Sequence, residues 1–528
     1  MHKVIFNPRI AITAFVIVSF YFFGSINELW KRELDVWLII YCLKTTIEVI
    51  ASLYAFFYFF VSVYYRKPKN AAYACKNKEF FDEQTAVIYL CCDDFDPEAL
   101  ESIVNCCDDK LLNIMVHDDS FTLTNRDKVN KTVELLCLRY KKEIKIMRRK
   151  EREGGKPGAL NYVVDNLTKD IKFIVICDSD SYFYDPSFFH KTLAYFKDAS
   201  TALVQFRNIG HIDSGDPERY RILSESINFY DAFTYFLDKV GWSPFLGHNS
   251  MLRVSAIKEV GYFTPGQFAD DIDFSIKLRL NGYGIKYARN IVCGERHPIT
   301  YEALRLRTHK WAYGCTQILL SWSKNVISST KLGIREKITF FLTISYYHSQ
   351  LCLLLYLTIF YLILPFYDPD MGGVVNLFVS SGLILLLTFL PSITYFIYNR
   401  KSKVWFSTIC LWGFTYGSQD FVIASSIFSG LSGKTKIWVP TNQKPKTHRV
   451  PTYYCESAFG SLIVAVALTN NPWLLLLPTT ILFAGKFFFA SWSNNLAFEN
   501  HDLTLMEANK KSSFVRVFQS LCSLKSRR

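Results

Sequence analysis

Hydrophobic residues form long runs near the two ends of the chain and short, spaced segments between them. The long runs cover residues 10–26, 36–65, 338–367, 374–398, 458–468 and 473–492. Because a helix needs about 20 mainly apolar residues to cross a bilayer, four of these runs qualify directly. The run 10–26 lies at the lower limit, and 458–468 needs the preceding residues 453–456 to complete it. We therefore predict about six transmembrane helices.

The region between these groups of runs has a different pattern, in which strand-length apolar segments alternate with segments of helical period. The expected strands are residues 86–92, 112–116, 144–147, 173–177, 202–206 and 285–287, and the expected helices are 97–105, 126–140 and 160–166. Such alternation is typical of a mainly parallel, Rossmann-like α/β sheet. We predict a single soluble domain of this kind between the two membrane regions.

The position of the charged residues changes the interpretation of a basic composition. The 528-residue chain carries a net charge of +13, which alone would suggest a nucleic-acid partner. Many basic residues instead flank the apolar runs, as Arg66 and Arg400 do, and such flanks are typical of the cytoplasmic side. Lys31 and Arg32 depart from this rule in the first outer loop. We expect a multi-pass protein of the cell membrane with a cytoplasmic central domain, both termini inside, and no nucleic-acid partner.

The cysteines do not indicate a zinc site. The chain has 14 of them, and Cys91-Cys92 and Cys106-Cys107 are adjacent pairs rather than C-x-x-C spacings. Thiols in membrane helices or a cytoplasmic domain stay reduced. We expect these residues to be structural.

Two acids follow the most hydrophobic of the expected strands. Asp178 and Asp180 come directly after residues 173–177. In an open α/β sheet, ligands bind outside the carboxyl ends of the strands, and paired carboxylates suit a hard divalent cation that holds a diphosphate. A D-x-D sequence in a solvated turn is common, so the neighbouring motifs have to decide between the two interpretations.

Further polar motifs occur along the same domain, namely His117-Asp118-Asp119-Ser120, Gly154-Gly155-Lys156-Pro157-Gly158, Gly247-His248-Asn249, Asp270-Asp271 and Arg307-Thr308-His309-Lys310-Trp311. The glycines permit close backbone approach, and Lys156 offers a point charge to phosphate. An ordinary glycine-rich turn with a solvated lysine is the alternative for that motif. Asp270 begins an expected helix that continues to Leu280, so simple capping is the alternative for Asp270.

The order of these motifs resembles that of the family 2 glycosyltransferases. The flanking apolar runs resemble those of the processive membrane synthases of cellulose, chitin, hyaluronan and poly-N-acetylglucosamine, and the resemblance covers nearly the whole chain. It implies an α/β GT-A domain, Rossmann-like and cytoplasmic, inserted between about six transmembrane helices and accompanied by interfacial helices.

The resemblance also implies a role for each motif residue. The residues implied for donor-nucleotide binding are Asp118, Asp119, Lys156, Asp178, Arg307 and Lys310; Asp180 is implied as the ligand of Mg²⁺ or Mn²⁺, and Asp271 as the catalytic base. Those implied for the acceptor side are Gly247, His248, Asn249, Asp270 and Trp311.

Three positions in two motifs depart from the family pattern. Arg307 and Lys310 stand where Q-x-x-R-W has glutamine and arginine, and a lysine keeps the charge but loses the bidentate fork. Asp270 stands where cellulose- and chitin-type enzymes have glutamate, whereas hyaluronan synthases have D-D.

We divide the chain into five expected regions. They are two N-terminal transmembrane helices (1–65), the glycosyltransferase domain (66–300), amphipathic interfacial helices with R-x-x-K-W (301–337), a C-terminal transmembrane channel (338–492) and a basic cytoplasmic tail (493–528) that contacts membrane lipid. Within the channel region, residues 404–431 are expected to lie at the interface or to re-enter. Residues 433–451 resemble a gating loop with Trp438, Thr441 and Lys444.

These features predict a processive, inverting hexosyltransferase that polymerises sugar from a UDP-sugar and moves the growing polysaccharide across the membrane, as in capsule or exopolysaccharide biosynthesis. A glucose homopolymer is preferred, while hyaluronan and amino-sugar polymers stay open. One alternative is a non-processive enzyme that glycosylates a lipid acceptor. Another, from a different class, is a transporter with a nucleotide-sensing domain, which would bind nucleotide without turnover.

Overall fold

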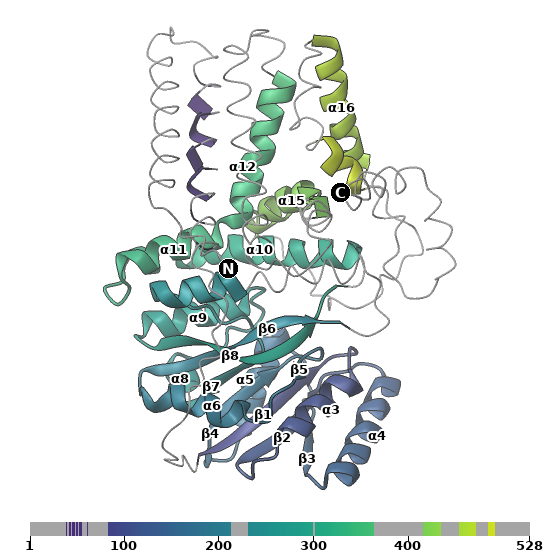
Figure 1. Cartoon of the computed structure of the whole chain (residues 1–528), viewed down its shortest axis with the longest axis vertical. Helices are drawn as coiled ribbons and strands as arrows, with labels where there is room; N and C mark the ends of the chain where they lie inside the picture. The colour runs from purple at the N-terminus through teal and green to yellow at the C-terminus, as the bar shows by residue number, and fades with distance from the viewer. Residues whose placement is uncertain are drawn as a thin grey trace, which may run out of the picture.

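The structure, a computed structural model, describes residues 83–212, 231–298, 301–363, 414–415, 417–433, 454–470 and 484–490, with separate positions between 39 and 61. The described residues form an α/β domain, a layer of helices that lies across it, and helices that extend away on the far side of that layer (Figure 1). The expected gating loop with Trp438, Thr441 and Lys444 lies outside the described residues.

The α/β domain is built on one eight-stranded sheet with the order β3-β2-β1-β4-β7-β6-β8-β5. The strands are β1 Gln84–Cys91, β2 Leu112–Asp118, β3 Ile144–Met147, β4 Ile171–Cys177, β5 Tyr182–Phe183, β6 Thr201–His211, β7 Ser250–Arg253 and β8 Gly284–Arg296. β1 to β4 are parallel, and β6 is parallel to β8. β7 and β5 run antiparallel to their neighbours, so the sheet is mixed.

The expected mainly parallel sheet is confirmed with two corrections. β5 and β7 were not predicted, because they have two and four residues and show no period that distinguishes them from loops. β6 and β8 extend well past the expected ends at residues 206 and 287. A register shift after Phe206 lets their pairing continue to His211 and Arg296, so both strands reach the carboxyl edge of the sheet.

Helices cover both faces of the sheet. The helices of this domain are α3 Pro97–Cys106, α4 Leu123–Tyr140, α5 Gly155–Asp165, α6 Phe188–Leu193, η1 Ala194–Lys197, α8 Val254–Glu259 and α9 Asp270–Leu280. α3 begins where Asp96 accepts hydrogen bonds from the backbone N–H groups of Glu98 and Ala99, and Pro97 needs no such partner. α9 ends at Leu280, as expected, and Asn281 of the following Asn281-Gly282 pair is its C-cap.

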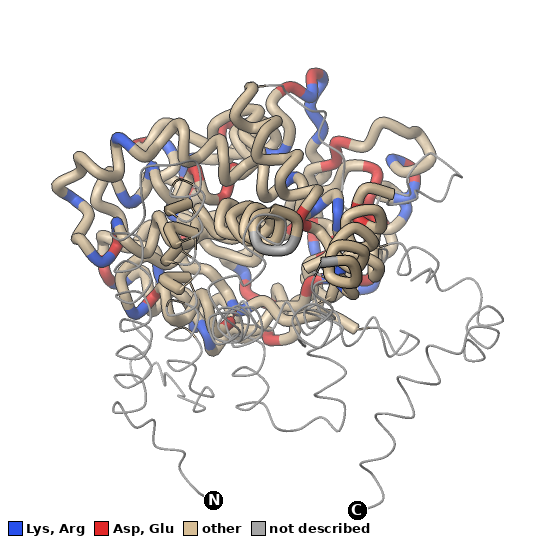
Figure 2. Tube along the Cα trace, turned by 90° about the horizontal axis from the view of Figure 1, so that it is seen from above, with Lys and Arg blue, Asp and Glu red and all other residues tan. Residues whose placement is uncertain are grey.

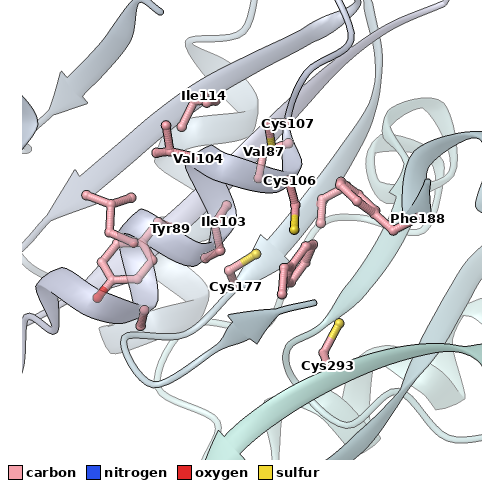
Figure 3. Packing of buried hydrophobic residues seen from close by; sticks show 14 of the residues in the cluster. Val87, Tyr89, Ile103, Val104, Cys106, Cys107, Ile114, Cys177, Phe188 and Cys293 are labelled. Carbon is pink, nitrogen blue, oxygen red and sulfur yellow. The ribbon is translucent and has the colours of Figure 1, made fainter. Parts of the chain in front are cut away.

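The core follows from the two-residue period of the strands. In β1, Val87 and Tyr89 face one side, where α3 and α6 pack, and Ala86 and Ile88 face the other, where α5, α8 and α9 pack. Figure 3 shows part of the first cluster, with the thiols of Cys106, Cys107, Cys177 and Cys293 among aliphatic and aromatic side chains. Burial raises the pKa of the thiol of Cys177. These cysteines pack as small apolar side chains, as expected.

A layer of helices crosses the α/β domain, and further helices lie above it (Figure 1). The elements are α10 Tyr301–Ser328, α11 Ile334–Ile344, α12 Tyr346–Thr358, η2 Ile359–Ile363, α15 Asp420–Leu431 and α16 Tyr454–Asn470. α15 lies along α10, where Gln317 donates to the carbonyl of Gly430 at 2.6 Å. Arg305 of α10 forms a 2.7 Å ion pair with Glu456 of α16.

The described helices include only parts of the expected membrane spans, so they test this prediction only in part. Among the described residues no single helix is long and apolar enough to cross a bilayer, and α11 with α12 passes that test only as a pair bent by 54°. The expected single run 338–367 is therefore broken at Ser345. α15 begins at Asp420, where the Gly417–Asp420 interruption ends. The interfacial position of α15 stays a prediction.

Candidate active site

Asp178 lies at the centre of a charged cluster at the carboxyl edge of the sheet. Its position follows from β4, which ends at Cys177. One oxygen, Oδ1, lies 2.5 Å from Nζ of Lys156, and the other, Oδ2, lies 3.7 Å from Nδ1 of His248. Burial opposes the ionisation of Asp178, but these two cations outweigh it, so the pKa of Asp178 lies below its ordinary value. Asp178 is therefore a carboxylate held between two positive groups.

Lys156 reaches this cluster because the glycine-rich segment begins a helix. Gly154 adopts a left-handed φ of +74°, and α5 starts at Gly155. A Cβ atom at Gly158 would lie 2.1 Å from the carbonyl oxygen of Glu153 and 2.7 Å from Nη1 of Arg149, so no side chain fits there. The expected helix 160–166 thus starts earlier, and its first turn presents Lys156 to Asp178. The alternative of a solvated turn lysine is wrong.

Asp270 and Asp271 occupy the first turn of α9, and although burial acts in the opposite direction, they and Asp178 raise the pKa of Lys156. Burial and then the carboxylate of Asp270 raise the pKa of Asp271 to about 6. Burial also raises the pKa of Asp270, although Lys156 and Lys310 oppose the rise. Asp270 does not cap the helix, because the N-cap is Ala269 and no side-chain cap hydrogen bond forms. The pair therefore consists of two partly buried carboxyl groups with raised pKa values, that of Asp271 being about 6.

The 246–249 loop brings His248 and Gly247 to these acids. Gln205 of β6 is fully buried, and both the nitrogen and the oxygen of its side-chain amide form hydrogen bonds with the loop. Its Nε2 donates to the carbonyls of His248 at 2.9 Å and Asn249 at 3.0 Å, and its Oε1 accepts from the backbone N–H of Leu246 at 2.8 Å. The loop is thus fixed by Gln205, which lies within the expected strand 202–206.

Asp118 and Asp119 at the end of β2 are each paired with an arginine. Arg148 lies 2.7 Å from Asp118, and Arg149 donates to both oxygens of Asp119, the shortest contact being 2.7 Å. His117 lies 3.2 Å from Asp119. Burial opposes ionisation of both acids, but hydrogen bonds and these cations hold the pKa of each below its ordinary value. The end of β2 therefore presents ionised acids of fixed orientation.

Asp180 fits the role of a metal ligand. Burial and then the nearby Glu295 carboxylate raise the pKa of Asp180 to about 7, which means that its negative charge is poorly compensated. A divalent cation would supply that compensation. No group of three or more His, Cys, Asp or Glu among the described residues is arranged to hold a metal. Mg²⁺ and Mn²⁺ can bind through one or two carboxylates with phosphate oxygens completing the shell, so Asp180 suits a metal that arrives with a diphosphate.

The R-x-x-K-W residues approach the site from α10. Burial lowers the pKa of Lys310, and Asp270 is the strongest influence in the opposite direction, so the ammonium lies near the acid pair. The guanidinium of Arg307 lies 4.7 Å from the ring centroid of Trp311. The structure thus brings Lys310 to the acids of α9 and pairs Arg307 with Trp311.

The structure gathers the predicted residues from β2, β4, α5, α9 and α10 at one edge of the sheet, and adds residues that the motifs did not include. His248, predicted for the acceptor side, contacts Asp178 of the donor side. The added residues are Arg148, Arg149, Asn208 and Glu295. Arg148 and Arg149 directly follow the expected strand 144–147, a signal that could have identified them. The roles of all these residues stay predictions.

The mixed, Rossmann-like sheet, with a D-x-D pair and a lysine at its carboxyl edge, is a GT-A-like α/β fold. Comparison with known proteins agrees with this class. Residues 173–416 match the family model described as glycosyl transferase family group 2. This part of the chain is therefore similar to the family 2 glycosyltransferases.

The relatives share part of their length with this chain. Glucomannan 4-beta-mannosyltransferase 7 of Arabidopsis thaliana is 26% identical over 234 residues, which cover 42% of this chain and 40% of the relative. Glucomannan 4-beta-mannosyltransferase 1 of Cyamopsis tetragonoloba is 23% identical over 233 residues, 43% of each chain. The chain thus spans well under half the length of these curated relatives.

A solved structure supports the fold. The mannosyltransferase PcManGT from Pyrobaculum calidifontis, in complex with GDP-Man and Mn²⁺, matches with a TM-score of 0.51 at 16% identity. The match covers 75% of this chain and 99% of that one.

Proposed function

We propose that this chain is a membrane polysaccharide synthase that transfers a hexosyl group from a nucleoside-diphosphate sugar to a hydroxyl of the growing polymer, with inversion. The observation that carries the proposal is the position of Asp271. It is a partly buried acid with a pKa of about 6, it lies beside Gly247 as Lys156 does, and Lys156 forms an ion pair with the D-x-D acid Asp178.

In the proposed reaction, Asp271 removes the proton from the acceptor hydroxyl as its oxygen forms a bond to the anomeric carbon. The bond from that carbon to the diphosphate oxygen breaks, and the nucleoside diphosphate leaves with the electron pair. Lys156 and Lys310 stabilise the negative charge that develops on the leaving group. Asp180 would hold Mg²⁺ or Mn²⁺, which adds further charge stabilisation to the diphosphate. The complex of PcManGT with Mn²⁺ and GDP-Man supports this metal requirement.

The donor is proposed to be a UDP-sugar, with glucose as the first sugar to test. GDP-mannose should be tested as well, because the relatives are named as glucomannan mannosyltransferases. Purified protein should be supplied with UDP-glucose, UDP-N-acetylglucosamine, UDP-glucuronate and GDP-mannose, singly and in pairs, and nucleotide release measured. Turnover of one donor or pair, with a long polymer as product, is expected. A single sugar added to a lipid would favour the non-processive alternative, and binding of donor without turnover would favour the transporter alternative.

We also propose that the chain spans the cell membrane about six times, with the catalytic domain and both termini cytoplasmic, and that it moves the polymer outward. The apolar runs of the sequence and their basic flanks support this topology. A cysteine introduced at Asn442, in a background without reactive native cysteines, should resist a membrane-impermeant reagent applied to intact cells. The same cysteine should react after the cells are opened. Labelling from outside would reject the proposed topology and the gating role of residues 433–451.

A further inference from the structure

A row of alternating charges extends from the predicted motifs to a residue outside them. Lys156 contacts Asp178 at 2.5 Å, Asp178 lies 3.7 Å from His248, and Nε2 of His248 lies 3.1 Å from Oε2 of Glu295. Glu295 belongs to the end of β8, more than 100 residues from Asp178 in the chain. The two ring nitrogens of His248 thus face two different acids.

Glu295 is itself held in place. Nδ2 of Asn208 donates to Oε2 of Glu295 at 3.0 Å, and Nδ2 of Asn249 donates to Oδ1 of Asn208 at 3.1 Å. Asn249 is fully buried and adopts a left-handed φ of +48°. The side chains of His248 and Glu295 are only 12% and 21% exposed. Glu295 is therefore a fixed acceptor for the imidazole rather than a solvated surface acid.

The arrangement limits how Asp178 can turn. Each carboxylate oxygen faces a different cation, Oδ1 facing Lys156 and Oδ2 facing His248. Lys156 has a long flexible side chain, whereas the imidazole is a rigid ring whose orientation is set by the partner of its other nitrogen. That nitrogen lies 3.1 Å from both Oε2 of Glu295 and Nδ2 of Asn208, and of these two atoms only the carboxylate oxygen can accept its proton. Outer carboxylates that orient a metal-bound histidine typically contribute about 10- to 100-fold to their site, and we expect an effect of this order here.

We propose that Glu295 is a positioning residue that acts through His248 to hold Asp178 in its donor-binding orientation. Glu295 touches neither the donor nor the reacting atoms in this scheme. The inference rests on the proposed function because it assigns Asp178 to the donor site. It adds a residue that the D-x-D and R-x-x-K-W motifs do not include.

The test is a double-mutant cycle of Glu295→Gln and His248→Gln, with donor KM, kcat and nucleotide affinity measured for each protein. Glu295→Gln keeps the size of the side chain and removes its charge. We expect the donor KM and the nucleotide dissociation constant to rise roughly 10- to 100-fold, with a smaller change in kcat. Because both residues act on the same carboxylate, the double variant should be no worse than His248→Gln alone.

Glu336→Gln is the matched control. Glu336 forms a partly buried ion pair with Arg279 of α9. The Glu336→Gln variant therefore shows the general effect of breaking an ion pair at a distance from the charged cluster. We expect a lower unfolding temperature and unchanged donor KM. Equal effects of Glu295→Gln and Glu336→Gln on KM and nucleotide affinity would overturn the inference, as would additive effects in the cycle.

A second variant protects the test against a folding defect. Asn208→Ala removes the amide that contacts both Glu295 and Nε2 of His248 and leaves both charges in place, so nucleotide affinity should again fall, and unchanged affinity would count against the inference. The two proposals can fail separately, because nucleotide affinity is measured beside turnover. Tight nucleotide binding that depends on Glu295 in a protein without sugar transfer would reject the proposed function and retain the inference. Normal sugar transfer and nucleotide affinity in Glu295→Gln would reject the inference and retain the proposed function.

Discussion

Gly247 lies directly against Asp271. A Cβ atom built on Gly247 would be 3.6 Å from Cβ of Asp271 and 3.6 Å from Nζ of Lys156, and the residue has a φ of +89°. Only glycine adopts this conformation without strain. We predict that Gly247→Ala lowers kcat by about tenfold or more, because a side chain strains this left-handed backbone beside Asp271, and costs about 1–2 kcal/mol in the free energy of unfolding. Steady-state kinetics and chemical denaturation measure the two effects.

Gly261 provides the control for this prediction. It has a similar φ of +82°, and a Cβ atom there would meet nothing within 4 Å. Gly261→Ala should therefore have a similar cost in stability with normal kcat. If both variants lose activity equally, the contact between Gly247 and Asp271 has no special importance.

Asp271→Asn should abolish transfer and leave donor binding intact. The amide cannot accept the proton of the acceptor hydroxyl, and a general base typically contributes about 10²- to 10⁴-fold to the rate. Nucleotide-sugar affinity, measured by calorimetry, should change little because the base acts in the chemical step. Asp165→Asn, at an exposed acid that accepts from Tyr262, is the control. Turnover by Asp271→Asn at more than a tenth of the parent rate would reject the assignment.

The pH dependence of transfer should show an acidic limb near pH 6. The pKa of Asp271 is raised to about 6, so the protonated form predominates below that value and cannot accept a proton. The value of kcat/KM should rise with pH through this range and level off above it. Because Asp270 is a close neighbour, the observed value belongs to the pair. A flat profile between pH 5 and 7, with chemistry rate-limiting, would contradict the role of Asp271.

Asp180→Asn should weaken the metal dependence of donor binding. The variant keeps the size of the side chain but removes the charge that a divalent cation would balance. Nucleotide affinity in the presence of Mn²⁺ should fall roughly 10- to 100-fold, and affinity in the presence of a chelator should stay close to that of the parent protein. Identical metal dependence in the two proteins would show that Asp180 is not a ligand.

Trp311→Ala should stop polymer elongation while donor hydrolysis and nucleotide binding persist. An aromatic ring binds the apolar face of a sugar, and Trp311 stands beside Arg307 on the helix that brings Lys310 to the acids. The alternative is that Trp311 anchors an interfacial helix, in which case folded yield falls and elongation per folded molecule is normal. Polymer length and rate per folded molecule distinguish the two.

Trp322 on the same helix is the structural control. Its Nε1 donates to Oδ1 of the buried Asp273 at 2.8 Å. Trp322→Phe should cost about 1–3 kcal/mol in stability because it leaves a buried acceptor without this partner. We expect no change in polymer length.

The local sequence pattern was sufficient to predict an element that is strongly apolar or that is followed by residues typical of a helix end. The apolar run before Asp178 predicts β4, and Asn281-Gly282 predicts the end of α9, because strand burial and helix termination depend on neighbouring residues. It failed for β7, whose four residues pair on both sides with strands distant in sequence. It also failed for the glycine-rich segment, since a turn and a helix start look alike until Gly158 is packed against Glu153 and Arg149.

The sequence by itself determined which chemical groups are present at the edge of the sheet, since Asp118, Asp178 and Asp271 stand at the ends of predictable elements. Only the tertiary structure decided which groups meet. The contact of His248 with Asp178 and Glu295 joins a loop and two strands through a register shift in β8. Such contacts depend on strand order and register across the whole sheet, and these are set by packing between distant segments rather than by any local pattern.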